Sequence, residues 1–347
     1  MSVPPPAILD YPLATPPAPG LAVVIAPGIR WLRMPLPFAL DHINLWLLEE
    51  AEGWTLVDTG YGNETTRGLW ERHIEGTLAG KPIARIVATH CHPDHLGNAA
   101  WLADRFDCRV TMTHGEFMAA HAIIDERAAH APADTCELFR LHGMSEPDVA
   151  ALLARGNMYR RGVPAAPASF DRMQGDDVIT AGGQQWRVIA GHGHSSEHAA
   201  LFASAHDVLI SGDMLLPKIS TNVAVWPSDP NGDPLGRFLR SLTSFETLPA
   251  STLVLPSHGL PFRGIPLRVA QLRAHHEERL AELAGAIAAA SAPLSAADAV
   301  PVLFRRELDI QQRFFAMGEA IAHLNHLWRQ GRVRRLRAAD GACRFAV

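Results

Sequence analysis

A short segment of this sequence, residues 89–98 (THCHPDHLGN), crowds together side chains of the kinds that bind metal ions. It holds the imidazoles of His90, His92 and His95 and the carboxylate of Asp94. Imidazole and carboxylate are the ligands that zinc takes when thiolates are absent. Because adjacent residues in so short a span point in different directions, division between two ions is more natural than one shared ion. His90 and His92 can share one face of an extended segment, whereas Asp94 and His95 lie beyond the turn that the intervening proline imposes.

Three later residues of metal-binding type each follow an apolar strand and lie next to glycine. They are His194 in AGHGHSSEH, Asp213 in VLISGDM and His258 in LVLPSHG. Loops that follow separate strands can meet along one rim of a sheet sandwich, where functional side chains commonly gather. A single residue of this kind would mean little. Their succession after the histidine cluster predicts one composite metal site.

The elements that must position these residues read as strands interrupted by helices. Residues 21–58 contain the short apolar strands LAVVIA, IRWLRM, INLWLLEE and WTLVDTG. A helix is expected at about residues 64–77, followed by the buried strand ARIVATH, which ends at His90. Residues from about 115 to 170 predict an α-helical insertion. Strands then return in DVITAG, QQWRVIAG, HAALFAS and HDVLISGD, which favours an α/β fold whose sheets are covered by helices.

The chain is expected to divide into three parts. Residues 1–20 form a proline-rich, extended N-terminus, residues 21–264 a catalytic domain, and residues 265–347 a helical module. The module opens with the amphipathic segment VAQLRAHHEERLAELAGAIAAA and ends in a two-stranded ribbon turning at Asp340-Gly341. Helices followed by a terminal hairpin suggest a small winged-helix-like module.

Composition excludes several classes of protein. A formal net charge of −5 gives no case for a nucleic-acid binder driven by overall charge. The four cysteines form no CxxC pair, which argues against a disulfide framework and a thiolate zinc site. The N-terminus lacks the pattern of a signal peptide, and no stretch approaches the roughly 20 apolar residues of a membrane helix. We therefore expect a cytoplasmic enzyme without a membrane partner.

These motifs resemble the signature of the metallo-β-lactamase fold superfamily. HCHPDH matches HxHxDH, and the later GH, GD and PSHG elements match the remaining ligand positions in order, over roughly residues 21–263. The resemblance implies an αββα fold, an α+β sandwich, here carrying the helical insertion and the small C-terminal winged-helix-like domain. It also implies two zinc ions. The first would be held by His90, His92 and His194, the second by Asp94, His95 and His258, with Asp213 bridging both.

The resemblance assigns supporting roles as well. Asp58, in LVDTG, matches the family's strand-end aspartate, which orients a ligand histidine. HSSEH has the spacing of the family's HTPGH, which favours His194 over His192 as the ligand. His198 would then support the ligands or the fold.

Hydrolysis is the reaction that such a site predicts. Two zinc ions can share one water and lower its pKa to near neutrality, giving a metal-bridging hydroxide that attacks a carbonyl carbon or phosphorus. Asp94 is expected to orient this hydroxide and handle its proton besides binding zinc. His92 stands where the redox branch of the superfamily carries glutamate, which supports hydrolysis. Iron or manganese could replace zinc.

Two substrate classes remain open. The first is a small-molecule ester, thioester or lactone, with the insertion capping an apolar pocket and with Tyr61 and Lys218 as candidate substrate contacts. The second is RNA or another phosphodiester, cleaved by a metal-dependent endoribonuclease that grips RNA through the C-terminal module. That module carries a local run of arginines: Arg329, Arg332, Arg334, Arg335 and Arg337. The module could instead close the pocket or form a homodimer.

Overall fold

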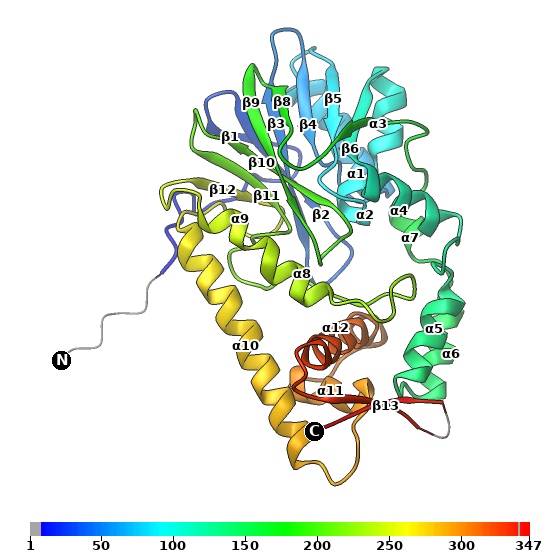
Figure 1. Ribbon diagram of the computed structural model, residues 1–347. Coiled ribbons are helices and arrows are strands. Elements are labelled where there is room, and N and C mark those ends of the chain that lie inside the picture. The colour runs from blue at the N-terminus through cyan, green and yellow to red at the C-terminus, as the bar shows by residue number, and fades with distance from the viewer. Residues whose placement is uncertain (1–7, 339–340) are drawn as a thin grey trace, which may run out of the picture.

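A computed structural model describes residues 8–338 and 341–347. Two β-sheets lie together in one half of the molecule, and the C-terminal helices form much of the other half (Figure 1). The first sheet consists of β1 (Ala22–Ala26), β2 (Ile29–Pro35), β3 (His42–Glu49), β4 (Trp54–Val57), β5 (Ile83–Val87), β6 (Arg109–Thr113) and β7 (Asp171–Met173), paired in that order. Its strands are antiparallel from β1 to β4 and parallel from β4 to β7.

The second sheet has the order β12-β11-β10-β9-β8. Its strands are β8 (Val178–Ala181), β9 (Gln184–Gly191), β10 (His198–Ala203), β11 (Val208–Gly212) and β12 (Leu253–Pro256). Only β11 and β12 pair in parallel, so the carboxyl ends of these two strands meet at one edge. That edge places the residues after them, Asp213 and His258, close together.

Alternating side chains explain why both sheets are covered on both faces. In β3, Trp46 and Leu48 point into a core shared with Trp186 and Leu201 of the second sheet. Leu45 of the same strand points the other way, toward helices packed on the outer face of the first sheet. The outer face of the second sheet is likewise covered by apolar helix surfaces. These layers confirm the predicted αββα sandwich.

The helices follow the order that the sequence predicted. The first sheet is flanked by α1 (Glu64–Arg72), a π-helical turn (His73–Thr77), α2 (Pro93–Leu96) and α3 (Ala99–Phe106). The predicted insertion contains α4 (His114–Ile124), α5 (Pro132–Leu141), α6 (Glu146–Ala154) and α7 (Tyr159–Gly162). Two further helices, α8 (Pro234–Ser241) and α9 (Thr243–Glu246), cover the second sheet. None of the helices in the described part of the chain has the length and apolar character needed to cross a membrane.

The C-terminal part contains three helices followed by a hairpin. These elements are α10 (Ile265–Ala289), α11 (Ala296–Leu303), α12 (Ile310–Arg329), β13 (Arg334–Arg337) and β14 (Cys343–Ala346). Asp309 and Ser295 begin α12 and α11 as N-caps in capping boxes. The helix-then-hairpin order agrees with the predicted module, whereas its likeness to a winged helix stays a prediction. Of the predicted turn, Asp340 lies outside the described residues, as do residues 1–7 of the N-terminus.

The module is not a separate body. Helix α12 packs against α8 and α6, and nearly all of its second half is buried. Gly318 lets α12 approach the catalytic domain closely, since a Cβ atom there would lie 2.8 Å from the Cβ of Ala224. The carboxamide of Asn325 donates to the carbonyls of Pro230 and Gly232. One apolar core therefore runs from the second sheet into the module.

This shared core predicts cooperative unfolding. Replacing Ile321 of α12, which is fully buried in this shared core, by alanine should lower the free energy of unfolding by about 2–5 kcal/mol. Urea unfolding followed by tryptophan fluorescence and by circular dichroism should show one transition in both proteins, shifted to lower urea in Ile321→Ala. Val24→Ala, at an exposed position, should leave the midpoint nearly unchanged. A module that unfolds first, with the midpoint of the sheets unaltered, would contradict a shared core.

Candidate metal centre

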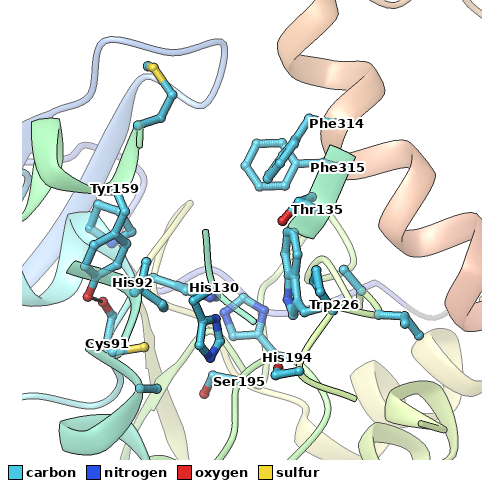
Figure 2. Close-up of a pocket in the computed structure, with 18 of the residues that line it drawn as sticks. Cys91, His92, His130, Thr135, Tyr159, His194, Ser195, Trp226, Phe314 and Phe315 are labelled. Carbon is cyan, nitrogen blue, oxygen red and sulfur yellow. Dashed lines mark hydrogen bonds between the residues drawn. The ribbon is translucent and has the colours of Figure 1, made fainter. Parts of the chain in front are cut away.

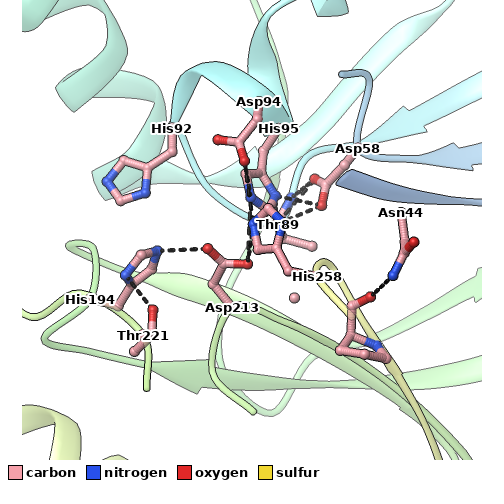
Figure 3. Close-up of polar contacts among 12 residues, drawn as sticks. Asn44, Asp58, Thr89, His92, Asp94, His95, His194, Asp213, Thr221 and His258 are labelled. Carbon is pink, nitrogen blue, oxygen red and sulfur yellow. Dashed lines mark hydrogen bonds and ion pairs between the residues drawn. The ribbon is translucent and has the colours of Figure 1, made fainter. Parts of the chain in front are cut away.

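The candidate ligands converge from the ends of several strands. The cluster at residues 90–95 follows β5, whereas His194, Asp213 and His258 follow β9, β11 and β12. Figure 3 shows six of these side chains pointing toward one another from separate segments: His92, Asp94, His95, His194, Asp213 and His258. All are buried or nearly so, and His90 and His95 have no exposed surface. The structure thus brings together every residue that the sequence proposed as a metal ligand.

One group of donor atoms is formed by three imidazoles. His90 Nε2 lies 2.9 Å from His92 Nδ1 and 3.2 Å from His194 Nε2. These ligand-type atoms lie within 4.8 Å of one another, close enough to surround a single cation. This is the trio that the resemblance assigned to the first ion.

A second group contains Asp94, His95 and His258, again with donor atoms within 4.8 Å of one another. The Asp94 carboxylate lies 3.4 Å from His258 Nε2 and 3.7 Å from His95 Nε2. This trio matches the one that the resemblance assigned to the second ion.

Asp213 lies between the two groups. Its Oδ2 atom is 3.3 Å from His194 Nε2, on the side of the first group. Its Oδ1 atom is 3.4 Å from His258 Nε2 and 3.6 Å from His95 Nε2, on the side of the second. A carboxylate with one oxygen directed at each group suits a bridging ligand.

Hydrogen bonds fix which nitrogen faces the site in three of the imidazoles, those of His95, His194 and His258. The Nδ1–H groups of His194 and His258 donate to the backbone carbonyls of Asn222 and His42, both at 2.8 Å. His95 Nδ1–H donates to Asp58 Oδ2, also at 2.8 Å. Because Nδ1 carries the proton in each ring, the Nε2 lone pair is left to bind a cation.

Asp58 occupies the supporting position that the sequence gave it, beside a ligand histidine. Its φ angle of 60° lies in the left-handed region, which aspartate and asparagine tolerate better than most residues. This turn aims the carboxylate at His95. The same carboxylate also accepts hydrogen bonds from the backbone N–H and the hydroxyl of Thr89. Thr89 in turn contacts His90 Nδ1 at 3.0 Å. Asp58 thereby fixes ligands of both groups.

The charges and the free atoms of the site fit a divalent cation. His95 Nε2 and Asp213 Oδ1 are buried and have no hydrogen-bond partner. Burial lowers the pKa of His92 to about 3, with His194 adding to the effect, so His92 is neutral and able to bind metal. Burial opposes charge on His258, but the carboxylates of Asp213 and Asp94 raise its pKa to about 10. This excess of negative charge attracts positive charge, which a bound cation would supply.

Other predicted residues fall at different distances from the centre. His198 Nε2 accepts the backbone N–H of Asp213 at 3.0 Å, so it holds the bridging residue in place. His192 instead contacts the Ser196 carbonyl through Nδ1. Tyr61 is buried and lines the adjoining cavity, with its ring edge against Phe38. Lys218 is exposed and does not line that cavity, so the structure does not bring it to the site.

Two residues that support the cluster were not found from the sequence. The fully buried carboxylate of Glu116 accepts the backbone N–H groups of Cys91 and Glu197 and so joins the two ligand-bearing loops. The Tyr159 hydroxyl donates to the Cys91 carbonyl. Glu116 and Tyr159 bind backbone atoms that are far away in the sequence. No local motif in the segments that contain them, HGEF and MYRRG, marks either residue.

A cavity of about 790 Å³ opens onto one side of the cluster, where Asp94, His92 and His194 form part of its wall. Figure 2 shows Tyr159 and His92 on one side of this cavity and Phe314 and Phe315 of α12 on the other. The remaining wall is mainly apolar and comes from the insertion and from the segment after β11. The C-terminal module therefore closes the cavity, one of the roles that the sequence left open.

The module also contacts the support of one ligand. The Asn222 carboxamide, next to the carbonyl that holds His194, donates to the Glu319 carboxylate of α12 at 3.0 Å. Thr221 Oγ1 lies 2.7 Å from the same His194 Nδ1. Burial raises the pKa of Glu319 to about 7. A short chain of hydrogen bonds thus connects α12 with the metal-binding histidine.

Comparison with known proteins identifies both parts of the chain. The profile described as Metallo-beta-lactamase superfamily matches residues 39–258. The profile described as Metallo-beta-lactamase-like, C-terminal domain matches residues 280–347. The first match contains all the candidate ligands, and this family typically holds divalent metal, most often zinc.

Individual relatives match most or about half of the chain. The crystal structure of a Beta-lactamase domain protein from Burkholderia ambifaria is 48% identical, with a TM-score of 0.90, over 97% of this chain and 98% of that one. The Probable metallo-hydrolase YqjP of Bacillus subtilis is 24% identical over 85% of this chain and 91% of that protein. The human Acyl-coenzyme A thioesterase MBLAC2 is 28% identical over 54% of this chain and 63% of that protein.

The contact between Asp58 and His95 predicts a measurable change in metal affinity. Asp58→Asn should keep the left-handed turn, but its amide cannot accept from both His95 and Thr89 as the carboxylate does. Zinc affinity, measured by competition with a chromophoric chelator, should fall about 10–100-fold. Asp176→Asn is the matched control, because Asp176 also has positive φ but is exposed and remote. Equal zinc affinity in both variants would contradict the role of Asp58.

Proposed function

From the premise that this chain belongs to the metallo-β-lactamase superfamily and is a metallo-hydrolase, we propose that it cleaves small-molecule thioesters or esters that carry an apolar acyl group. Family membership confirms the resemblance given by HCHPDH. The observation that carries the proposal is the cavity, because its largely apolar wall adjoins the metal ligands directly. Its volume of about 790 Å³ lies within the range of small-molecule sites.

The wall of the cavity suits an acyl group. Leu152 comes from the insertion, Trp226 from the segment after β11, and Phe314 from α12. These side chains can bury hydrocarbon without leaving polar groups unpaired. The name of the human relative, an acyl-coenzyme A thioesterase, supports the thioester among the candidate substrates. A cyclic ester such as a lactone offers the same electrophilic carbonyl.

The residues have distinct parts in the proposed reaction. Two zinc ions would be held by the two groups of ligands with Asp213 between them, and such ions lower the pKa of coordinated water and polarise a substrate carbonyl. The Asp94 carboxylate lines the cavity, where it can orient the attacking water and accept its proton. Burial of Asp94 opposes charge, but His95 and His258 lower its pKa to about 2, so the carboxylate is ionised and can accept a hydrogen bond from the attacking water. Tyr61 lines the same cavity, which supports its proposed contact with the substrate.

The RNA alternative has less support. Helix α12 precedes the hairpin, as a groove-reading helix of a winged helix would, but its second half is buried against the catalytic domain. Several arginines of the basic run also have partners within the protein: Arg329 and Arg335 contact Asn231, and Arg332 lies near Glu277. Side chains engaged in this way are poorly placed to grip a phosphate backbone.

A hydrolysis panel tests the proposal. The zinc-loaded protein should cleave acyl thioesters and esters with far higher kcat/KM than a β-lactam, a phosphodiester or single-stranded RNA. Removal of metal by a chelator should abolish turnover, and added zinc should restore it. Asp213→Ala, which removes the residue between the two ligand groups, should remain inactive after zinc is added. Cleavage of RNA without cleavage of any thioester or ester would favour the alternative instead.

A further inference from the structure

We propose that Arg155 forms, with Gln311, an anion-binding subsite in the α12 side of the cavity, so that the preferred substrate carries a carboxylate or phosphate in addition to its reactive carbonyl. This inference rests on the proposed function and extends it, because it names a second chemical group of the substrate. The subsite contains none of the metal ligands, and it differs from the apolar side chains around it by its charge.

Arg155 lies where the insertion meets the module. It follows α6 directly and lines the cavity, and its Nη2 atom donates to Gln311 Oε1 at 3.2 Å. Gln311 is in the first turn of α12, one turn before Phe314. Figure 2 shows Phe314 across the cavity from Tyr159 and His92. Arg155 is therefore on the α12 side, and the body of a substrate can extend between it and the metal ligands.

The guanidinium of Arg155 has unused donors. An arginine carries five N–H groups, and within the described ranges the only hydrogen bond recorded for this side chain is the one to Gln311. No carboxylate of the described residues lies within 4.0 Å of it. The amide oxygen of Gln311 is neutral, so it satisfies one donor without balancing the charge.

Two neighbouring arginines differ from Arg155 because each is paired with a carboxylate. Arg237 also lines the cavity, but its Nη2 atom lies 2.7 Å from the Asp229 carboxylate. Arg313, at the same contact between α6 and α12, pairs with Asp148 at 2.8 Å. Arg155 is thus a cationic side chain in the wall, half-buried, whose charge is not balanced by a carboxylate of the described chain.

This placement suits a specific chemistry. A guanidinium beside apolar side chains such as Leu152 and Phe314 attracts an anion more strongly than one in bulk water. Its planar fork matches the two oxygens of a carboxylate or phosphate in a bidentate pair. The anion can belong to the far end of the acyl chain or to a phosphate on the thiol leaving group. Both sources present the same oxygens to Arg155, and the experiment separates them.

Two matched pairs of substrates provide the test. The first pair is the decanoyl and ω-carboxydecanoyl thioesters of N-acetylcysteamine, which differ in the acyl end. The second is decanoyl pantetheine and decanoyl phosphopantetheine, which differ in the leaving group. In one pair the wild type should prefer the anionic member, and Arg155→Gln should raise the KM of that member about 10-fold or more while leaving the neutral member unchanged. The affected pair identifies the source of the anion.

Two further variants separate charge recognition from structure. Arg155→Lys keeps the charge without the fork and should recover only part of the preference. Arg160→Gln is the matched control, since Arg160 is exposed, near in sequence and outside the lining. The subsite is overturned if Arg155→Gln raises the KM of the neutral and anionic members equally. It is also overturned if the wild type prefers neither anionic member.

A binding measurement keeps the outcome independent of turnover. Calorimetric titration of the zinc-loaded protein with decanedioate, which has a carboxylate at each end, should show about 10-fold weaker binding in Arg155→Gln, whereas decanoate should bind both proteins equally. If no thioester is cleaved but decanedioate binding still depends on Arg155, the proposed function fails and the subsite stands. If neutral thioesters are cleaved, neither substrate pair responds to Arg155→Gln and both acids bind both proteins equally, the function stands and the subsite fails.

Discussion

The structure depends on holding several candidate metal-binding side chains close together at largely buried positions. Polar groups buried in this way are costly unless each has a partner, and two of the candidate ligands meet this condition through backbone carbonyls of distant segments. His194 is held by the Asn222 carbonyl and His258 by the His42 carbonyl. Each bond therefore fixes a loop as well as an imidazole. Among the candidate ligands, the buried atoms without a hydrogen-bond partner are His95 Nε2 and Asp213 Oδ1, which belong to the donor groups of the candidate metal centre.

This requirement explains why the C-terminal module is fused to the catalytic sheets. The segment that supports His194 is itself held by α12, through the Glu319 carboxylate on Asn222 and through the backbone N–H of Val225 on the Gly318 carbonyl. The close approach at Gly318 is possible because glycine has no Cβ atom to meet Ala224. Disturbing the module therefore disturbs one end of the metal centre. The shared apolar core and this polar link act in the same direction.

The predictable part of the site is the part whose signal is local. Three imidazoles and a carboxylate within residues 90–95 reveal a metal site without any knowledge of the fold, and strand ends beside glycine locate its remaining ligands. Glu116 could not be found in this way, because it binds backbone N–H groups of Cys91 and of Glu197. Lys218 shows the converse. It lies near Asp213 in sequence, but burial ends at Pro217 and the next residue, Lys218, is exposed.

Substrate selection is harder to read from the sequence because its residues are dispersed. The ligands all fall within the superfamily match at residues 39–258, whereas the aromatic wall of α12 falls outside it, in the C-terminal match at residues 280–347. Arg155 belongs to the insertion between two ligand-bearing segments. Only packing of α12 against α6 brings Arg155 and Gln311 into one cavity. The ligands of the centre are thus encoded in short motifs, and we propose that selectivity for the substrate depends on how the insertion and the C-terminal module meet at the cavity.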